Sequence, residues 1–297
     1  MPAVGVPRGR VQLGILHQHP THAVSRRPVH VNPQALPLCQ TASITTDAYD
    51  VNTDIEPRLR VFSEAGFRFL HWCDHWVSAH KYSDEETART KGLLDRYGLV
   101  CTDIHGVCAV EEGETLSLTC WVELNANRMD FIRGLGGDAI VIHLPVPALA
   151  GAATEFEVAR EMTDALLPEA RARGVQVAVE NGNASLIREL FNAYPPEDLL
   201  FCLDAGHSNM AGDLDTLETF VDRLLVVHLH DNHGNSDEHD LPGTGTTDWP
   251  RVMALLGRAP LLRTLNLEVG LRTDEDRLAW AHRAYASLGR LHQLLNG

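Results

Sequence analysis

Eight short apolar segments alternate with amphipathic stretches from residue 40 onward, and this alternation limits the fold more than any other feature. The segments are rich in Val, Ile and Leu, as expected of strands that are buried on both faces. Parallel strands joined by helices produce such a pattern, so we expect a single (β/α)8 TIM barrel, with a doubly wound open sheet as its rival. The expected strands are residues 42–46, 67–72, 98–105, 139–144, 175–180, 199–204, 224–230 and 264–269.

Capping signals mark where some of the connecting helices begin and end. Residues 83–98 open on Ser83, have Glu86 three positions later and close on Gly98. This pattern is a capping box followed by a glycine stop. Residues 154–174 also place apolar side chains at helical spacing before a glycine. Further helices are expected at residues 216–224, 248–257 and 273–295.

Residues 1–40 do not share the alternation. The first 46 residues contain four Arg but no Asp or Glu. No apolar run of about 7–15 residues follows the basic residues, so we do not expect a secretory signal; a transit peptide is the alternative. We divide the chain into an irregular or disordered N-terminal extension, residues 1–40, and one barrel domain, residues 41–297.

The overall charge excludes some partners. The chain has 25 Lys and Arg against 40 Asp and Glu, and Lys81 and Lys91 are its only lysines. Broad binding to nucleic acid or to an acidic membrane needs a basic face. No apolar run reaches the roughly 20 residues of a membrane helix. We therefore expect neither nucleic acid nor membrane as a partner.

Two further features favour an enzyme of the cytoplasm without a familiar nucleophile or phosphate loop. The six cysteines include no C-x-x-C pair, and several lie in or beside apolar runs, so we interpret them as reduced core thiols. The chain has neither a G-x-S-x-G elbow nor a G-x-x-x-x-G-K-[ST] loop. Residues 243–248 are interpreted as a turn that leads into a helix at Asp248.

A His, Asp or Glu lies at or near the C-terminal end of every expected strand except the first. A barrel brings the C-terminal ends of its strands to one face, where active sites lie. Residues that are far apart in the sequence should therefore meet at one mouth. His105 and His143 are compatible with either a core role or a ligand role. The set consists of His71, His105, His143, Glu180, Asp204, His228 and Glu268, with His207 three residues after Asp204.

Three acids of this set suggest a metal site. Glu180 and Glu268 each end an otherwise apolar strand, and a lone buried carboxylate is costly unless it is paired or bound to a metal. Asp204 could merely cap the next helix. The nearby His207 favours a ligand role instead.

The stretch 226–245 contains four histidines and four acids. His228 and His230 point the same way on a strand of period two, so we expect one ligand and one neighbour. His233 is expected to be solvated. Two Glu, one Asp and one His suit Mn²⁺, Mg²⁺ or Co²⁺, and additional imidazoles favour Zn²⁺.

The segment "HWCDHW" is interpreted as one wall of the pocket. Its histidines flank two tryptophans, whose rings would offer an apolar surface to a sugar face. Direct metal binding by these histidines is the lesser alternative. The expected wall residues are His71, Trp72, His75 and Trp76.

Over roughly residues 42–295 the chain resembles the xylose-isomerase-like TIM barrel superfamily, the sugar phosphate isomerases and epimerases. The resemblance rests on "VAVENG", "FCLDAGHSNM", "VVHLHDNHG" with "DEHDLPGTGTTDW", and "LNLEVG". It implies one divalent cation, with Mn²⁺ or Zn²⁺ first and Co²⁺ or Mg²⁺ as alternatives. The implied ligands are Glu180, Asp204, His228 and Glu268.

The endonuclease IV branch of the same superfamily is similar and implies a cluster of two or three ions instead. Its barrel binds DNA, whereas the region after residue 46 has 21 basic against 40 acidic residues and lacks clustered Lys and Arg. In the single-ion alternative, the same additional residues would contact substrate. These residues are His105, His143, His207, Asp237 and His239.

The leading functional expectation is a metal-dependent isomerase or epimerase of carbohydrate metabolism. It would act on a sugar or polyol ketone through an enediolate, with Glu180 and Glu268 as acid and base and His207 orienting a substrate oxygen. A multinuclear zinc phosphodiester hydrolase is the alternative, as is a dehydratase that uses the same enolisation. A metal-binding barrel without catalysis is a further alternative. The oligomeric state stays open, a homo-oligomer included.

Overall fold

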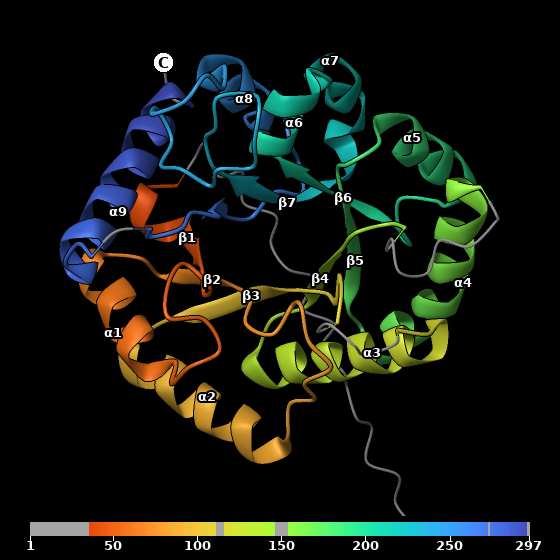
Figure 1. The fold of residues 1–297 in the computed structure, drawn as a ribbon, viewed down its shortest axis with the longest axis horizontal. Helices are drawn as coiled ribbons and strands as arrows, with labels where there is room; N and C mark the ends of the chain where they lie inside the picture. Colours follow the sequence, from red (N-terminus) through yellow and green to blue (C-terminus); the bar gives the residue numbers. More distant parts are fainter. Residues whose placement is uncertain (1–35, 111–115, 146–153, 273, 296–297) are drawn as a thin grey trace, which may run out of the picture.

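The computed structural model describes residues 36–110, 116–145, 154–272 and 274–295. Within them, parallel strands close into a barrel in the order β1 to β8, and β1 pairs with β8. The helices surround the strands (Figure 1). The expected barrel is confirmed and the open sheet is excluded. Most of the expected N-terminal extension lies outside the described residues.

Each strand lies inside a segment that the sequence predicts. Every residue of five of the strands is buried, which explains why these segments are mainly apolar. The last strand is the shortest, so Glu268 follows it directly. The strands are β1 (Ala42–Thr45), β2 (Phe69–Trp72), β3 (Val100–His105), β4 (Ala139–Ile142), β5 (Gln176–Glu180), β6 (Leu200–Asp204), β7 (Leu224–Leu229) and β8 (Leu265–Leu267).

The capping signals are confirmed. Ser83 and Glu86 form a capping box at the start of the second helix, and Gly98 ends that helix with a φ of 65°. Asp248 caps the eighth helix, as expected for the turn before it. The helices are α1 (Glu56–Ala65), α2 (Asp84–Tyr97), α3 (Leu118–Leu135), α4 (Glu155–Arg173), α5 (Ala184–Ala193), α6 (Ala205–Ala211), α7 (Leu214–Leu217), α8 (Trp249–Leu256) and α9 (Arg277–Leu294).

The connection before β7 differs from the prediction of one helix over residues 216–224. It consists of the single turn α7 and a 3-10 helix, Glu218–Arg223. Because β7 already begins at Leu224, the connection is short, and 3-10 turns serve short connectors. Residues 273–295 also form a shorter helix than expected, since α9 begins only after its cap at Asp276.

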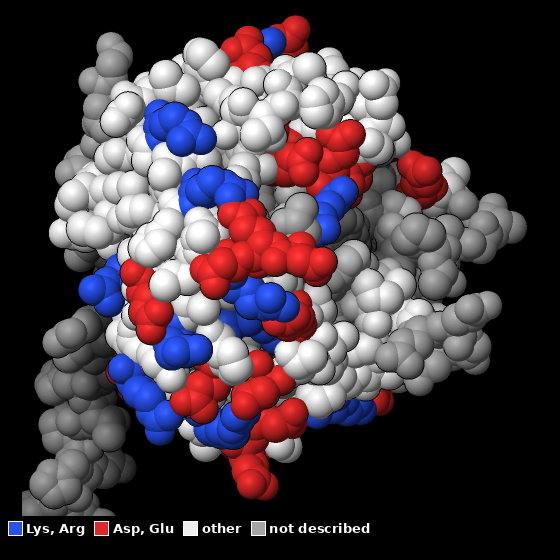
Figure 2. All heavy atoms as spheres, turned by 60° about the vertical axis from the view of Figure 1, so that its left-hand side comes forward, with Lys and Arg blue, Asp and Glu red and all other residues white. Residues whose placement is uncertain are grey.

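Acidic and basic side chains are interspersed on the face that Figure 2 shows. Surface arginines of the described chain pair with acids, for example Arg89 with Asp54 at 2.7 Å and Arg277 with Asp50 at 2.9 Å. On this face the charges are therefore mixed, without a continuous basic surface. None of the helices that the structure describes is long and apolar enough to pass through a bilayer.

The prediction that the cysteines are core thiols holds for only part of the set. All six are free, and three lie on or directly after strands and are buried: Cys73, Cys101 and Cys202. Cys108 and Cys120 are partly exposed, and Cys39 is exposed. These three lie in a loop, a helix and a 3-10 turn, where the alternation that buries strand residues does not apply.

Candidate metal centre at the barrel mouth

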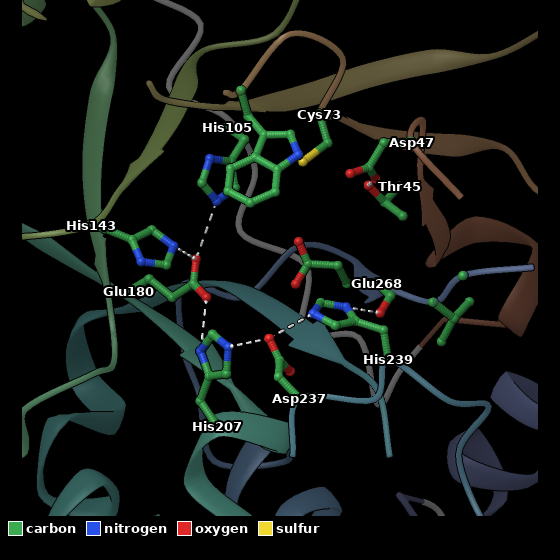
Figure 3. A pocket seen from close by; sticks show the side chains of 13 residues that line it. Thr45, Asp47, Cys73, His105, His143, Glu180, His207, Asp237, His239 and Glu268 are labelled. Atoms are coloured by element: carbon green, nitrogen blue, oxygen red, sulfur yellow. Dashed lines mark hydrogen bonds and ion pairs between the residues drawn. The ribbon is translucent and has the colours of Figure 1, made fainter. Parts of the chain in front are cut away.

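The C-terminal ends of the strands surround a cavity of about 300 Å³ (Figure 3). Several acids and histidines from different strands point into it, as a barrel mouth predicts. All five of the additional candidate residues, His105, His143, His207, Asp237 and His239, are among those that line it. The full lining consists of Thr45, Asp47, Cys73, Trp76, His105, His143, Glu180, His207, Asp237, His239, Glu268, Val269 and Gly270.

The four implied ligands come together. Glu180 and Glu268 line the cavity, whereas Asp204 and His228 are fully buried. One oxygen or nitrogen atom from each lies within 4.8 Å of one such atom from each of the others. We refer to these four residues as the Glu180 group.

Atoms of the Glu180 group are close without forming ordinary hydrogen bonds. Nδ1 of His228 lies 3.0 Å from Oε2 of Glu268 and 3.3 Å from Oε2 of Glu180. Both nitrogens of His228 and Oε2 of Glu180 are nevertheless buried without a hydrogen-bond partner. Unpaired buried polar atoms are costly. A divalent cation among them would satisfy these atoms, and the donor set of three carboxylates and one imidazole fits such an ion.

The electrostatics of the two glutamates also favour a cation. Burial raises the pKa of Glu180, but the imidazoles of His143 and His228 outweigh it and hold the pKa well below its ordinary range. Burial likewise opposes ionisation of Glu268. His228 outweighs that effect and lowers the pKa of Glu268, although the charge of Glu180 opposes the change. The carboxylates of Glu180 and Glu268 are therefore both ionised, and they lie close together in a buried position.

Asn181 fixes the ends of β5 and β6 relative to each other. Its Nδ2 donates to the carbonyl oxygen of Asp204 at 3.0 Å, and its Oδ1 accepts from the Asp204 N–H at 2.5 Å. The Asp204 carboxylate in turn accepts from the N–H of His207 at 2.6 Å and caps α6. Both readings of Asp204 are thus compatible: it caps a helix and belongs to the Glu180 group.

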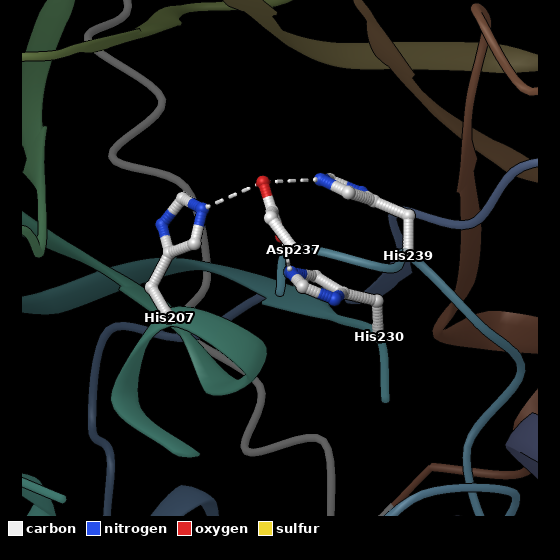
Figure 4. A group of neighbouring side chains, drawn as sticks. All are labelled: His207, His230, Asp237 and His239. Atoms are coloured by element: carbon white, nitrogen blue, oxygen red, sulfur yellow. Dashed lines mark hydrogen bonds and ion pairs between the residues drawn. The ribbon is translucent and has the colours of Figure 1, made fainter. Parts of the chain in front are cut away.

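A second set of donors, the Asp237 group, consists of His207, His230, Asp237 and His239 (Figure 4). Oδ2 of Asp237 lies 3.3 Å from Nε2 of His207 and 3.1 Å from Nε2 of His239. Nδ1 of His239 donates to the Glu268 carbonyl at 2.9 Å, the type of outer contact that metal-bound histidines commonly make. Burial opposes the charge on His207, but the carboxylates of Asp204, Asp237 and Glu180 outweigh it and raise its pKa to about 12. Burial likewise opposes ionisation of Asp237, but His207 and His239 outweigh it and lower the pKa of Asp237.

His230 was expected as a neighbour of the ligand His228. It belongs to the Asp237 group and also contacts Asp204 of the Glu180 group. Its Nε2 is 3.0 Å from Oδ1 of Asp204 and 3.6 Å from Oδ1 of Asp237. Its ring stacks on His239, with centroids 4.0 Å apart. Only glycine leaves room for this ring at position 206, because a Cβ there would lie 1.9 Å from Cε1 of His230.

Asp231 organises the loop that carries Asp237 and His239, two members of the Asp237 group. Its carboxylate is buried and accepts from the N–H of Gly243 at 2.8 Å, the N–H of Thr247 at 3.1 Å and Nε1 of Trp249 at 2.9 Å. The three donors lie along residues 243–249. This one side chain therefore fixes where the loop returns to the barrel.

A third set, the Cys108 group, consists of His105, Cys108 and His143. Nε2 of His143 lies 3.1 Å from Oε2 of Glu180, and Nε2 of His105 lies 3.6 Å from the same oxygen. Burial opposes ionisation of the Cys108 thiol, but the two imidazoles outweigh it and lower the pKa to about 6. Glu180 thus faces both this group and His228.

Of the four expected wall residues, only Trp76 lines the cavity. Trp72 points away from it, because successive residues of a strand face opposite sides. Its ring packs on Phe131, and its Nε1 donates to Tyr82 at 2.9 Å.

Neither histidine of the expected wall lines the cavity, but a nitrogen of His71 lies within 4.8 Å of ligand atoms of His228 and Glu268, so His71 adjoins the Glu180 group. His71 is fully buried, contacts Asp103 through Nδ1, and its ring lies 4.6 Å from that of His228. His75 stacks on His80 outside the mouth. His233 is partly solvated, as expected, with Nδ1 2.7 Å from Glu238.

Sequence reasoning missed several side chains of the site. Asp47 lines the cavity and accepts from Thr45 Oγ1 at 2.5 Å. It lies two residues after β1, so inspecting the residues just beyond each strand, rather than its last residue, would have found it. Cys108 follows His105 by three residues, and this spacing alone does not indicate a metal site.

Comparisons with known proteins agree with this architecture. The model of the family described as xylose isomerase-like TIM barrel matches residues 59–288. The protein y4fM of Sinorhizobium fredii is 29% identical over 278 residues, which cover 81% of this chain and 89% of that protein.

Solved structures share the fold at low identity. A xylose isomerase domain protein of Alicyclobacillus acidocaldarius superposes with a TM-score of 0.69 at 17% identity and covers 86% of this chain and 99% of that one. A 3-keto-D-glucoside 4-epimerase of E. coli superposes with a TM-score of 0.64 at 20% identity, with coverages of 85% and 99%.

Proposed function

Because this chain belongs to the xylose isomerase-like TIM barrel family, we propose that it is a divalent-metal-dependent isomerase or epimerase of a sugar or related polyhydroxy ketone. The observation that carries the proposal is the placement of Glu180 and Glu268, whose carboxylates both contact Nδ1 of His228 at the base of a cavity. Two carboxylates at one reacting carbon can act as the acid and base of an epimerisation.

The roles follow from this arrangement. The Glu180 group would hold the cation, which would supply polarisation of a ketone and its neighbouring hydroxyl. One glutamate takes the proton from the carbon beside the ketone, and the other returns a proton to that carbon. His207 lies beside Glu180, with Nδ1 3.3 Å from Oε1, and binds a substrate oxygen.

The cavity favours a small neutral substrate. Its volume of about 300 Å³ suits a monosaccharide-sized molecule, and its described lining contains acids and imidazoles but no Lys or Arg. Such a lining offers many hydrogen-bond acceptors to hydroxyl groups. The epimerase whose structure resembles this chain acts on a keto-glucoside by name, which supports the same substrate class.

The test is deuterium incorporation from heavy water into a panel of ketoses, with Mn²⁺ or Co²⁺ supplied to the full chain. We expect deuterium at the carbon beside the ketone, together with an isomer or epimer. Glu268→Gln should lower this rate by roughly 10²–10⁴-fold, the usual contribution of a general base. Glu123→Gln, at a surface pair with Lys81, is the matched control and should leave the rate unchanged. Absence of exchange with every ketose would contradict the proposal.

A multinuclear phosphodiester hydrolase is the second candidate, because the Asp237 and Cys108 groups place further donors around the same cavity. The acidic lining argues against it, since phosphate recognition needs basic groups. Efficient nicking of abasic duplex DNA that is lost in Glu180→Ala would support this candidate over the first. A dehydratase would share the deuterium exchange but release a product that has lost water.

A further inference from the structure

The loop after β3 holds Cys108 in a fixed place. Its N–H donates to the Trp76 carbonyl at 3.0 Å, and the neighbouring Val107 N–H donates to Oδ1 of Asn125 at 3.0 Å. The Val107 carbonyl accepts from Nε1 of Trp121 at 2.8 Å. These bonds connect the loop to the loop after β2 and to α3. They fix the backbone that carries the Cys108 thiol.

Gly106, the residue after β3, is packed closely against β4 and α3. Its N–H donates to the Val141 carbonyl at 2.7 Å. A Cβ at this position would lie 2.7 Å from Oδ1 of Asn125 and 2.9 Å from the Val141 carbonyl oxygen, so a larger residue would displace the loop. In this loop the thiol of Cys108, three residues after His105, lies beside the imidazole.

The sulfur lies among metal-binding atoms. Sγ of Cys108 is 3.7 Å from Nδ1 of His105 and 3.7 Å from the Gly106 carbonyl oxygen. It lies within 4.8 Å of a nitrogen of each imidazole of its group. Oε2 of Glu180, which faces both imidazoles, is buried without a hydrogen-bond partner. Nδ1 of His105 donates to the Gly106 carbonyl at 2.8 Å, so Nε2, which faces Glu180, is the nitrogen left for an ion. Neighbouring ligand atoms in tetrahedral zinc sites are about 3.5 Å apart, so the sulfur, which faces Nδ1 here, has to move toward Nε2 to share that ion.

We propose that Cys108 is a sulfur ligand of a soft divalent metal ion, held with His105 and His143 beside Glu180. This position is additional to the one in the Glu180 group, and it relies on the proposed function only through their shared residue, Glu180. Two imidazoles, a thiolate and a carboxylate form a donor set that selects Zn²⁺, Co²⁺ or Cd²⁺ over Mn²⁺ or Mg²⁺. Binding replaces the S–H bond with a sulfur–metal bond and releases the proton to water, without change of oxidation state.

The direct test is titration of the metal-free full chain with Co²⁺, followed by absorption in the near ultraviolet. A sulfur-to-cobalt charge-transfer band is expected in the native protein and should be lost in Cys108→Ser. Cys39→Ser is the matched control, because this thiol is exposed and lies before β1, at the opposite end of the barrel. A band that persists in Cys108→Ser, for instance from the buried Cys202, would overturn the proposal. Absence of the band in the native protein would also overturn the proposal, because a thiol that only forms hydrogen bonds gives no such band.

A second measurement needs no variant. Cd²⁺ should protect Cys108 from alkylation by iodoacetamide, while the exposed Cys39 reacts with and without the ion. Equal modification of Cys108 with and without Cd²⁺ would contradict the assignment. Mn²⁺ binding and ketose exchange report on the Glu180 group and not on Cys108. If the cobalt band is absent while Mn²⁺ binding and ketose exchange are present, the proposal for Cys108 fails and the proposed function does not.

Discussion

Nδ1 of His228 lies 3.0 Å from Oε2 of Glu268, yet this nitrogen has no hydrogen-bond partner. The two atoms are close but do not align as donor and acceptor. The His228 ring is fully buried, so water does not reach this nitrogen, whereas Glu268 lines the cavity. A cation bound by both would explain the arrangement, and this inference supports the metal site at the mouth of the barrel.

Metal should therefore stabilise the folded chain. An ion that binds only the folded state adds about 2.7 kcal/mol at a free concentration one hundred times its Kd. We expect Mn²⁺ at that excess to raise the free energy of unfolding by this amount and a chelator to reverse the gain, as measured by urea denaturation. The double change Glu180→Ala with Glu268→Ala should abolish the dependence on Mn²⁺. A gain of equal size in that variant would show that the ion binds elsewhere.

The Asp237 group is predicted to serve the substrate rather than an ion. His239→Ala should leave the number of bound Mn²⁺ equivalents unchanged but raise KM for a ketose substrate, because it removes a side chain from the cavity wall. Elemental analysis and steady-state kinetics measure the two quantities. Loss of one metal equivalent in both Asp237→Ala and His239→Ala would instead favour the multinuclear hydrolase.

Asp231 should make stability depend on pH. Burial opposes its ionisation, but the Trp249 indole N–H and the N–H groups of the loop outweigh it and lower the pKa of Asp231 in the folded chain. Its contribution is therefore fully present above the unfolded pKa of about 3.9 and is lost as the pH falls through the lower folded value.

At pH 7, Asp231→Asn should cost about 1.5–3 kcal/mol, the usual value of a hydrogen bond to a charged group. The difference from the native chain should shrink below about pH 4. Asp215→Asn, at an exposed pair with Arg251, is the control and should cost about 0–1 kcal/mol. A cost for Asp231→Asn that stays constant from pH 7 to pH 3 would contradict the assigned ionisation.

The N-terminal extension is predicted to be dispensable for the barrel and its metal. Deletion of residues 1–35 should leave the Mn²⁺ content and the thermal midpoint unchanged. Deletion of residues 1–38 also removes the Leu36 carbonyl, which lies 3.0 Å from Nε2 of His292, and the packing of Leu38 on the core. We expect that longer deletion to cost roughly 1 kcal/mol. A large loss of stability on removing only residues 1–35 would show that they pack on the barrel.

The fold was predictable because strand burial leaves a clear pattern. Segments such as residues 139–144 and 199–204 are almost wholly apolar and have a polar residue at or next to their C-terminal end, which marks both a buried strand and the active face. The connection before β7 was predicted wrongly as one helix. Its apolar residues have helical spacing, but the chain that is left before Leu224 is too short for one continuous helix.

The site residues at strand ends could be predicted from the sequence, whereas those whose positions depend on loop conformation could not. Glu180 and His228 sit at strand ends, so their convergence follows from the topology. Trp72 was misplaced because the facing of a single strand residue depends on register, and one position reverses it. The places of Asp47 and Cys108 depend on loop backbones, such as the closely packed backbone at Gly106, which composition and periodicity do not specify.

The most direct test of the metal site is elemental analysis of the full chain and its single alanine variants after exposure to Mn²⁺ and removal of free ions. We predict one equivalent in the native protein and none in Glu180→Ala or Glu268→Ala, with the circular dichroism of a folded barrel in all three. Full metal occupancy in both folded variants would contradict the account, because the ion would then lie outside the Glu180 group.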